Sequence, residues 1–160
     1  MAPPMARDRH RRWCAARRVG SLTGELRNSQ REEPLLKPHK PDTLHPPFSA
    51  YSPGMEATAK RWLHISGQIG VDKAGRVAAG SEAQMRECWH HIFEILKSAG
   101  MTKRNLVKIT GYLVDPKDVG AYREVRDGLL DGHEPASTLV VVARLANPVW
   151  LVEIEAVAAA

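Results

Sequence analysis

The hydrophobic pattern is densest near the C-terminus, where two runs rich in β-branched residues flank a short turn that contains Asn147 and Pro148. The first run, residues 135–145, is apolar at nearly every position from Leu139 to Val142. The second run, residues 150–157, alternates apolar and acidic side chains. Such runs on either side of a turn are typical of paired strands, so we expect two neighbouring strands, the first of them covered on both faces.

The alternation in the second run puts Glu153 and Glu155 on one face of its strand, together with Leu151 and Val157. Carboxylates are rarely buried without partners. Two interpretations therefore stay open: either the carboxylates face solvent, or they line a polar cleft that another subunit closes.

Two segments have the periodicity of amphipathic helices. Residues 81–99 begin at Ser81, the expected N-cap, and Cys88 lies beside their apolar stripe, which favours a core thiol over a nucleophile. The second helix starts at Asp115-Pro116 and runs to about Leu130. The two apolar stripes consist of Met85, Trp89, Ile92, Leu96 and Ala99 in the first helix and Val119, Tyr122, Val125 and Leu129 in the second.

The remaining elements are extended. Residues 42–60 read as a bent lead-in, Arg61–Ser66 and Leu106–Val114 as strands, and Gly67 as a β-bulge or a close backbone approach. The order of elements predicts an α+β domain whose mostly antiparallel sheet carries two helices on one face. The other face would be left bare and apolar, which predicts self-association.

The N-terminal part of the chain differs in composition. Residues 1–40 carry ten lysines and arginines against four acidic residues, whereas residues 41–160 carry thirteen against fourteen. Residues 1–41 also lack a sustained hydrophobic period, so we predict a basic, disordered leader at 1–41 and a folded domain at 42–160. A solvated or spurious tail, a targeting segment and a contact to polyanions all remain open for the leader.

Length and cysteine usage narrow the class of protein. No run approaches the roughly 18 apolar residues of a membrane helix, so no membrane partner is expected. Cys14 and Cys88 are predicted to be free thiols, and no metal-ligand spacing is present, which favours a reduced, cytoplasmic compartment and no metal site.

Several short motifs resemble the RidA/YjgF family of small trimeric proteins, whose best-known members hydrolyse reactive enamines and imines. The motifs occur in the family's order and at its separations: Tyr51-Ser52, Ile65–Ile69, Leu106–Thr110, Pro135-Ala136 and Leu151–Ala156. The resemblance covers about residues 42–160. It implies a chorismate-mutase-like fold, a homotrimer formed through the bare sheet faces, a small-metabolite cleft at each interface, and no cofactor.

The resemblance also implies roles for single residues. Tyr51 would line the cleft, Ser66 and Gly67 would offer backbone groups to the ligand, and Glu153 would hold the attacking water. Water adds to the C=N carbon of a 2-imino acid and ammonia leaves. The protein need only fix the substrate carboxylate, place the water and move a proton.

One position departs from the family's pattern. Active members read Pro-Ala-Arg, and that arginine grips the substrate carboxylate in a bidentate pair. This chain has Ser137 there, and Leu139 falls where those members have Cys or Thr. Arg123, which shares the polar side of the second helix with Arg126, is either a replacement anion contact or a solvated surface arginine.

Three functions are consistent with these features. The first is a RidA-like homotrimer that binds a small metabolite in its interface clefts, with weak, altered or absent imine hydrolysis. The second is an active enamine/imine deaminase, a hydrolase that releases ammonia from a substrate without need of the usual arginine. The third is an RNA-directed role through the basic leader. Nucleic acid is the least favoured partner, because the folded part is nearly neutral and lacks an aromatic and basic platform.

Overall fold

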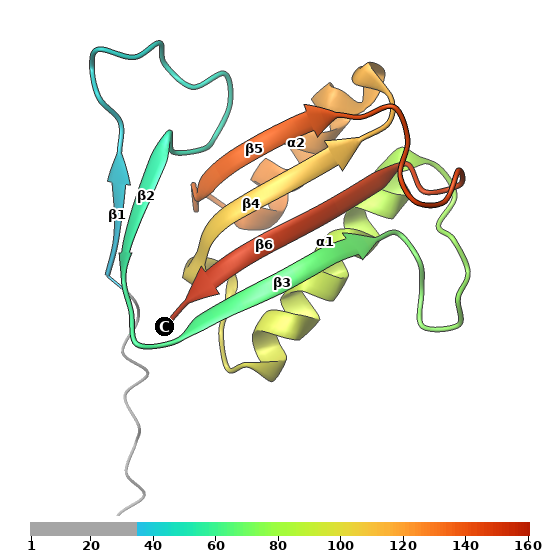
Figure 1. Ribbon diagram of the computed structural model, residues 1–160, viewed down its shortest axis with the longest axis horizontal. Coiled ribbons are helices and arrows are strands. Elements are labelled where there is room, and N and C mark those ends of the chain that lie inside the picture. The colour runs from blue at the N-terminus through green and yellow to red at the C-terminus, as the bar shows by residue number, and fades with distance from the viewer. Residues whose placement is uncertain (1–34) are drawn as a thin grey trace, which may run out of the picture. The chain divides into compact units, whose positions relative to one another are not determined.

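The computed structural model describes residues 35–160 (Figure 1). The predicted leader, residues 1–41, lies outside the described residues except for its last positions, 35–41. The strands are β1 (Leu35–His39), β2 (Gly54–Thr58), β3 (Trp62–Ile69), β4 (Leu106–Leu113), β5 (Ala136–Val141) and β6 (Val152–Ala159), and the helices are α1 (Ser81–Ser98) and α2 (Val119–Leu130). Two 3₁₀ turns precede β4 and α2: Lys103–Asn105 and Pro116–Asp118.

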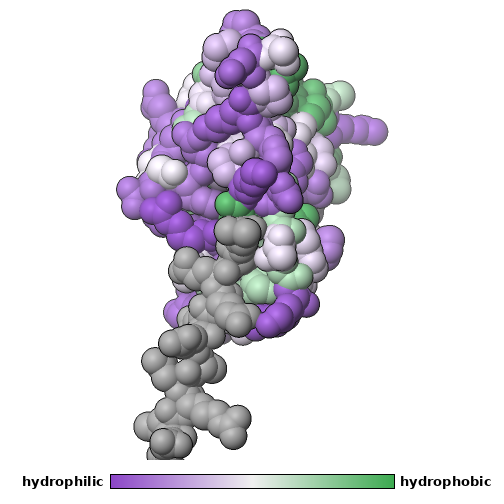
Figure 2. Space-filling model, turned by 90° about the vertical axis from the view of Figure 1, so that its left-hand side faces the viewer, coloured by the Kyte–Doolittle hydropathy of each residue, from purple (hydrophilic) through white to green (hydrophobic). Residues whose placement is uncertain are grey.

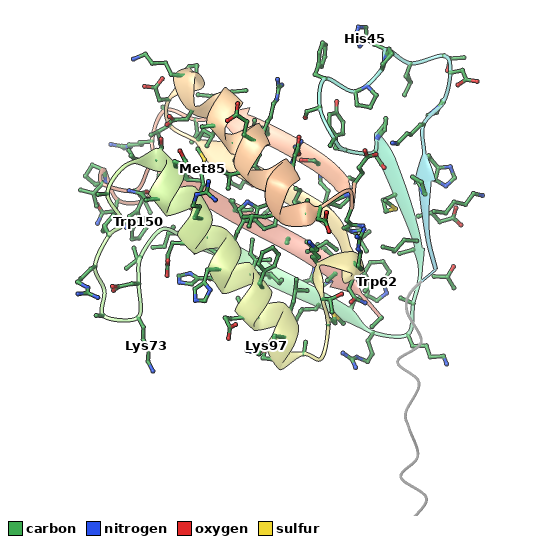
Figure 3. All side chains as sticks on the ribbon, turned by 180° about the vertical axis from the view of Figure 1, so that it is seen from behind. His45, Trp62, Lys73, Met85, Lys97 and Trp150 are labelled. Carbon is green, nitrogen blue, oxygen red and sulfur yellow. The ribbon has the colours of Figure 1, made fainter. Side chains whose placement is uncertain are left out.

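The main sheet has four strands in the order β3-β6-β4-β5. β6 pairs antiparallel with both β3 and β4, whereas β4 and β5 are parallel. Both helices lie across the same face of this sheet and leave the other face open (Figures 1 and 3). The α+β architecture that the order of elements predicts, and the chorismate-mutase-like fold that the family resemblance implies, are therefore confirmed.

The predicted pairing of the two C-terminal strands is wrong, because β4 lies between β5 and β6. The chain passes from β4 to β5 through α2, and a crossover of this kind joins parallel neighbours. β5 is consequently an edge strand, and Val140 and Val141 are 38% and 42% exposed. Its β-branched composition reflects strand propensity rather than burial on both faces.

A second, two-stranded sheet is formed by β1 and β2, which pair antiparallel from Leu35 opposite Thr58 to His39 opposite Gly54. The prediction of disorder is therefore wrong for residues 35–39. The ring of His39 lies 2.8 Å from the Glu56 carboxylate. The side of the molecule that β1 and β2 form is mostly hydrophilic (Figure 2).

The core lies between the helices and the inner face of the main sheet. Trp89 and Tyr122 are the largest fully buried side chains, and the alternation of β6 puts Val152 and Ile154 against the helices. Cys88 is fully buried among them, as predicted. Burial raises the pKa of its thiol to about 12, so the sulfur stays protonated and is a poor nucleophile.

The start of α1 differs from the prediction in one detail. Gly80, with φ of 85°, is the N-cap, and Ser81 is the first helical residue. The Ser81 hydroxyl instead donates to Asp118 Oδ1 at 2.7 Å and ties the start of α1 to the turn before α2. Neither helix of residues 35–160 has the length and apolarity needed to cross a membrane.

Candidate functional site

The residues predicted to form the site fall into two groups on opposite sides of the main sheet. Ser66, Gly67 and Glu153 belong to the open face, on β3 and β6; we call them the open-face group. The other group lines a pocket on the helix side of β5, which we call the arginine pocket: Tyr51, Arg123, Ser137 and Leu139. A single chain does not bring the two groups together, because β4 separates β6 from β5.

In the open-face group, Gly67 and Glu153 are in close contact. The pairing of β3 with β6 shifts register between Ile65 and Gln68, which places the predicted bulge at Gly67. A Cβ added to Gly67 would lie 1.8 Å from Glu153 Oε1. Both the bulge and the close approach are thus present, and the glycine leaves the Glu153 carboxylate room beside the β3 backbone.

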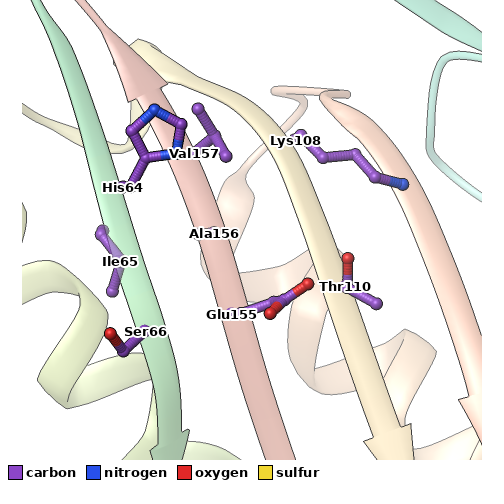
Figure 4. A pocket seen from close by; sticks show the side chains of 8 residues that line it. All are labelled: His64, Ile65, Ser66, Lys108, Thr110, Glu155, Ala156 and Val157. Carbon is purple, nitrogen blue, oxygen red and sulfur yellow. The ribbon is translucent and has the colours of Figure 1, made fainter.

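The rest of the open face is more polar than the bare apolar surface that the element order predicts. A pocket of about 300 Å³ lies on it, lined by His64, Ile65, Ser66, Lys108, Thr110, Glu155, Ala156 and Val157 (Figure 4). Desolvation lowers the pKa of Lys108. The Tyr112 hydroxyl donates to Glu155 at 3.3 Å, and desolvation followed by the Glu155 charge raises the pKa of Tyr112.

The arginine pocket has a volume of about 170 Å³ and adds three residues to those predicted: Phe48, Ser49 and Arg126. The lead-in segment reaches it because Ser52 is anchored beside β5. The Ser52 backbone N–H donates to the Pro135 carbonyl at 3.2 Å, and its hydroxyl donates to the Glu134 carbonyl at 2.8 Å. This anchoring brings Tyr51 to the same pocket as Ser137.

Arg126 is the main feature of this pocket that the sequence analysis missed. It was placed on the polar side of α2, yet only 2% of the residue is exposed. Its Nε and Nη2 lie 2.7 Å from Asp127 Oδ1, Nη2 donates to Ser49 Oγ at 2.7 Å, and Nη1 donates to Ser137 Oγ at 3.3 Å. A buried guanidinium therefore lies directly beside the residue that stands in the arginine position of the predicted motif.

Arg123, one turn earlier on α2, lines the same pocket and is only half-buried. Its side chain has no hydrogen bond or ion pair within residues 35–160. The same part of the chain has no group of three or more His, Cys, Asp or Glu side chains arranged to hold a metal ion. The arginine pocket therefore supplies cations and hydroxyls, and the open-face group supplies one carboxylate, that of Glu153.

A family model described as endoribonuclease L-PSP matches residues 43–160, which is most of the chain. The chain belongs to the RidA/YjgF family. A RutC family protein of Pyrococcus horikoshii is 36% identical over 114 residues, which cover 70% of this chain and 88% of that protein. The 2-iminobutanoate/2-iminopropanoate deaminase of Rattus norvegicus is 36% identical over 100 residues, which cover 61% of this chain and 72% of the enzyme.

Solved structures of the RidA/YjgF family have the same fold. A Rid-family protein of Yersinia pestis superposes with a TM-score of 0.72 at 30% identity and covers 78% of this chain and 98% of that one. RidA from an Antarctic Psychrobacter gives a TM-score of 0.60 at 28% identity, with 70% and 94% covered. The family fold thus accounts for the described domain, with Ser137 at the edge strand and Glu153 on the open face.

Proposed function

We propose that the chain is a RidA-like homotrimer that binds a small metabolite in clefts between subunits, with imine hydrolysis that is weak, altered or absent. The observation that carries the proposal is the separation of the two groups. The open-face group holds Glu153 but no arginine, and the arginine pocket holds Arg123 and Arg126 but is lined by no carboxylate. Hydrolysis of an imino acid needs both a cation and a base.

A neighbouring copy supplies the missing half if its arginine pocket faces the open face of the first. Closed rings use such heterologous contacts, in which two different patches of identical chains meet. Within residues 35–160 no helix lies over the open face of the sheet, so that face is available for this contact (Figure 1). Relatives named as 2-iminobutanoate/2-iminopropanoate deaminases support the reaction class.

In the proposed reaction, Glu153 orients a water molecule and accepts its proton as the water oxygen attacks the imine carbon. The C=N π electrons move to nitrogen, which is protonated. Collapse of the resulting carbinolamine gives a carbonyl product and ammonia. Tyr51 and Leu139 form walls of the cleft, Ser66 and Gly67 present backbone groups, and Arg123 supplies the contact to an anion.

Ser137 is the reason to expect reduced activity. A charge-assisted bidentate contact to a carboxylate contributes on the order of 2–4 kcal/mol. Its loss from position 137 corresponds to a roughly 30- to 1000-fold lower kcat/KM than in relatives that carry the arginine, and the activity that remains depends on Arg123 and Glu153. An active deaminase on a substrate that does not need this contact is the alternative within the same class.

Mixed trimers test the shared site. Glu153→Gln and Arg123→Asp, each impaired alone, are unfolded together and refolded as a mixture. If each site takes Glu153 from one subunit and Arg123 from the next, about a quarter of the sites are intact in a random mixture, and ammonia release returns in proportion. The wild-type chain should show three times the monomer mass in light scattering. A monomer, or mixtures no more active than their parents, would contradict the proposal.

The remaining expectations stay predictions. An RNA-directed role depends on the basic leader, most of which lies outside the described residues. A cytoplasmic location is inferred from the cysteine pattern alone. A panel of imines with and without a carboxylate separates a metabolite-binding protein from an active deaminase through the ammonia each imine releases.

A further inference from the structure

Lys108 lies on β4 and lines the pocket of about 300 Å³ on the open face, which we call the open-face pocket (Figure 4). The side chain is half-buried, and its amine donates a hydrogen bond to Oγ1 of Thr138 on β5. It has no ion pair within residues 35–160. Lys103, which is also half-buried, pairs with Asp131 at 3.6 Å. Lys108 is thus a partly desolvated amine that no carboxylate neutralises directly.

The register of the sheet explains why Lys108 and Glu155 do not pair. Val157 on β6 lies opposite Lys108, and Glu155 lies opposite Thr110. Glu155 is therefore the diagonal neighbour of Lys108, at a distance that long side chains can bridge. The Glu155 carboxylate instead accepts a hydrogen bond from the Tyr112 hydroxyl at 3.3 Å. The amine and the carboxylate consequently both face the open-face pocket without closing on each other.

The walls of the open-face pocket favour the uncharged form of this amine. Ile65, Ala156 and Val157 contribute apolar surface. Desolvation lowers the pKa of Lys108, against the opposing effect of the Glu155 charge. An uncharged amine has a free lone pair, and desolvation of lysine in an apolar pocket is a recognised route to a nucleophile that attacks carbonyl carbons.

We propose that Lys108 is a covalent modification site at which small uncharged aldehydes condense reversibly with the chain. The lone pair of Nζ attacks the aldehyde carbon, and the C=O π electrons move to oxygen. Glu155 carries one proton from the nitrogen to that oxygen, which gives a carbinolamine. The second amine proton then leaves with the hydroxyl group as water, and a C=N bond remains. Amine and aldehyde give imine and water, so no oxidant or reductant is needed.

The open-face pocket also limits which aldehyde reacts. The negative charge of Glu155 disfavours a carbonyl compound that carries a carboxylate. The volume of about 300 Å³ and the apolar wall suit a short alkyl chain. Propanal therefore has the expected chemistry, and glyoxylate, an aldehyde with a carboxylate, is the matched comparison.

This inference goes beyond the proposed function and uses neither Glu153 nor Arg123. Tyr112, which lies opposite Glu153, is four residues from Lys108 on β4, a separation of about 13 Å along the strand. A neighbouring copy placed over Glu153 would enclose the open-face pocket further and desolvate the amine more. The test therefore uses the full chain in its assembled state.

The test treats the folded chain with propanal and cyanoborohydride, which reduces each imine to a stable amine. Peptide mass spectrometry at early times gives the labelling rate of every lysine separately. Lys108 should be labelled roughly 3- to 10-fold faster than Lys117, whose side chain is 89% exposed. In concentrated urea the two lysines should react at the same rate, because the difference belongs to the folded pocket.

Two variants check the parts of the site. Lys108→Arg keeps the charge and removes the nucleophile, so the fast labelling should disappear while that of Lys117 is unchanged. In Glu155→Gln the ratio of glyoxylate to propanal labelling at Lys108 should rise roughly 3- to 10-fold, because the repulsion is gone. If Lys108 in the folded chain is labelled no faster than Lys117, or if fast labelling persists in Lys108→Arg, the inference is overturned. Ammonia release does not enter this test, so its outcome is independent of the proposed hydrolysis.

Discussion

A carboxylate oxygen of Glu153 occupies the space that a side chain at Gly67 would need. A Cβ at position 67 would lie 1.8 Å from Glu153 Oε1 and 2.6 Å from its Cδ, far closer than two such atoms approach. The two residues lie on neighbouring strands at the point where the pairing of β3 with β6 shifts register. The position of the proposed catalytic carboxylate therefore depends on the absence of a side chain on the adjacent strand.

Gly67→Ala should displace the Glu153 carboxylate. We expect kcat/KM for ammonia release to fall by at least about 10-fold, since a misplaced general base loses most of its effect. Stability should change by only about 1 kcal/mol, because the obstructing group is the movable end of a side chain on the open face. Steady-state kinetics and urea unfolding measure the two effects.

Gly128→Ala is the matched control, because nothing lies within 4 Å of a Cβ at that position of α2. It should leave kinetics unchanged and stabilise the helix by up to about 1 kcal/mol. Full activity in Gly67→Ala would show that this glycine does not set the position of Glu153.

The fold was largely predictable because apolar residues recur at helical spacing in both helices and alternate with acidic residues in β6. Met85, Trp89, Ile92 and Leu96 recur at helical spacing and are all buried, as expected. The pairing of β5 was not predictable in this way. Its β-branched run has the same composition as that of a central strand, and only the crossover through α2 decides that it lies at an edge. β1 was not predicted either, and within residues 35–160 it pairs with β2 alone, outside the main sheet.

His133 gives a pH dependence with a defined sign. Desolvation lowers the pKa of its ring, whose Nε2 donates to the Leu106 carbonyl at 2.7 Å. Below about pH 6.5 the unfolded chain binds a proton that the folded chain resists, so stability is lost as the pH falls. His133→Gln should lose about 1 kcal/mol at pH 7.5 through the missing hydrogen bond.

The difference in the free energy of unfolding between His133→Gln and the wild type should narrow at pH 5.5. The variant no longer has the imidazole whose protonation opposes folding in acid. Urea midpoints at the two pH values measure it. His90→Gln, an exposed position on α1, serves as the control and should follow the wild type at both values. If the difference in urea midpoint between His133→Gln and the wild type stays constant or widens at pH 5.5, the pKa of His133 is not lowered in the folded chain.

The candidate site was only partly predictable. Tyr51, Arg123, Ser137 and Leu139 were expected together and do line one pocket. Arg126 was not singled out, because an arginine on a helix has the same sequence signature whether it is solvated or buried. Its burial depends on Ser49 and Ser137, which are 77 and 11 residues away along the chain. The separation of Glu153 from this pocket likewise follows from the strand order, which the sequence pattern predicted wrongly because it paired β5 with β6.

Restoring the family's arginine alone should not improve this protein. In Ser137→Arg a second guanidinium would enter the region where Arg126 Nη1 now lies 3.3 Å from the Ser137 hydroxyl. Arg123 lines the same small pocket, so three cations would meet there. Asp127, which pairs with Arg126, does not line the pocket. Like charges at such separations are unfavourable, and we expect Ser137→Arg to lose roughly 1–3 kcal/mol of stability without a gain in kcat/KM.

The double variant Arg126→Ser with Ser137→Arg moves the guanidinium from α2 to β5 and leaves the net charge unchanged. It should regain stability relative to Ser137→Arg, and its kcat/KM on a 2-imino acid should exceed that of either single variant. Because the two positions are in contact, the effects should be non-additive, and a double-mutant cycle measures the coupling between them. Ser137→Arg that is as stable as the wild type and faster on the 2-imino acid would show that Arg126 does not hinder a second guanidinium at position 137.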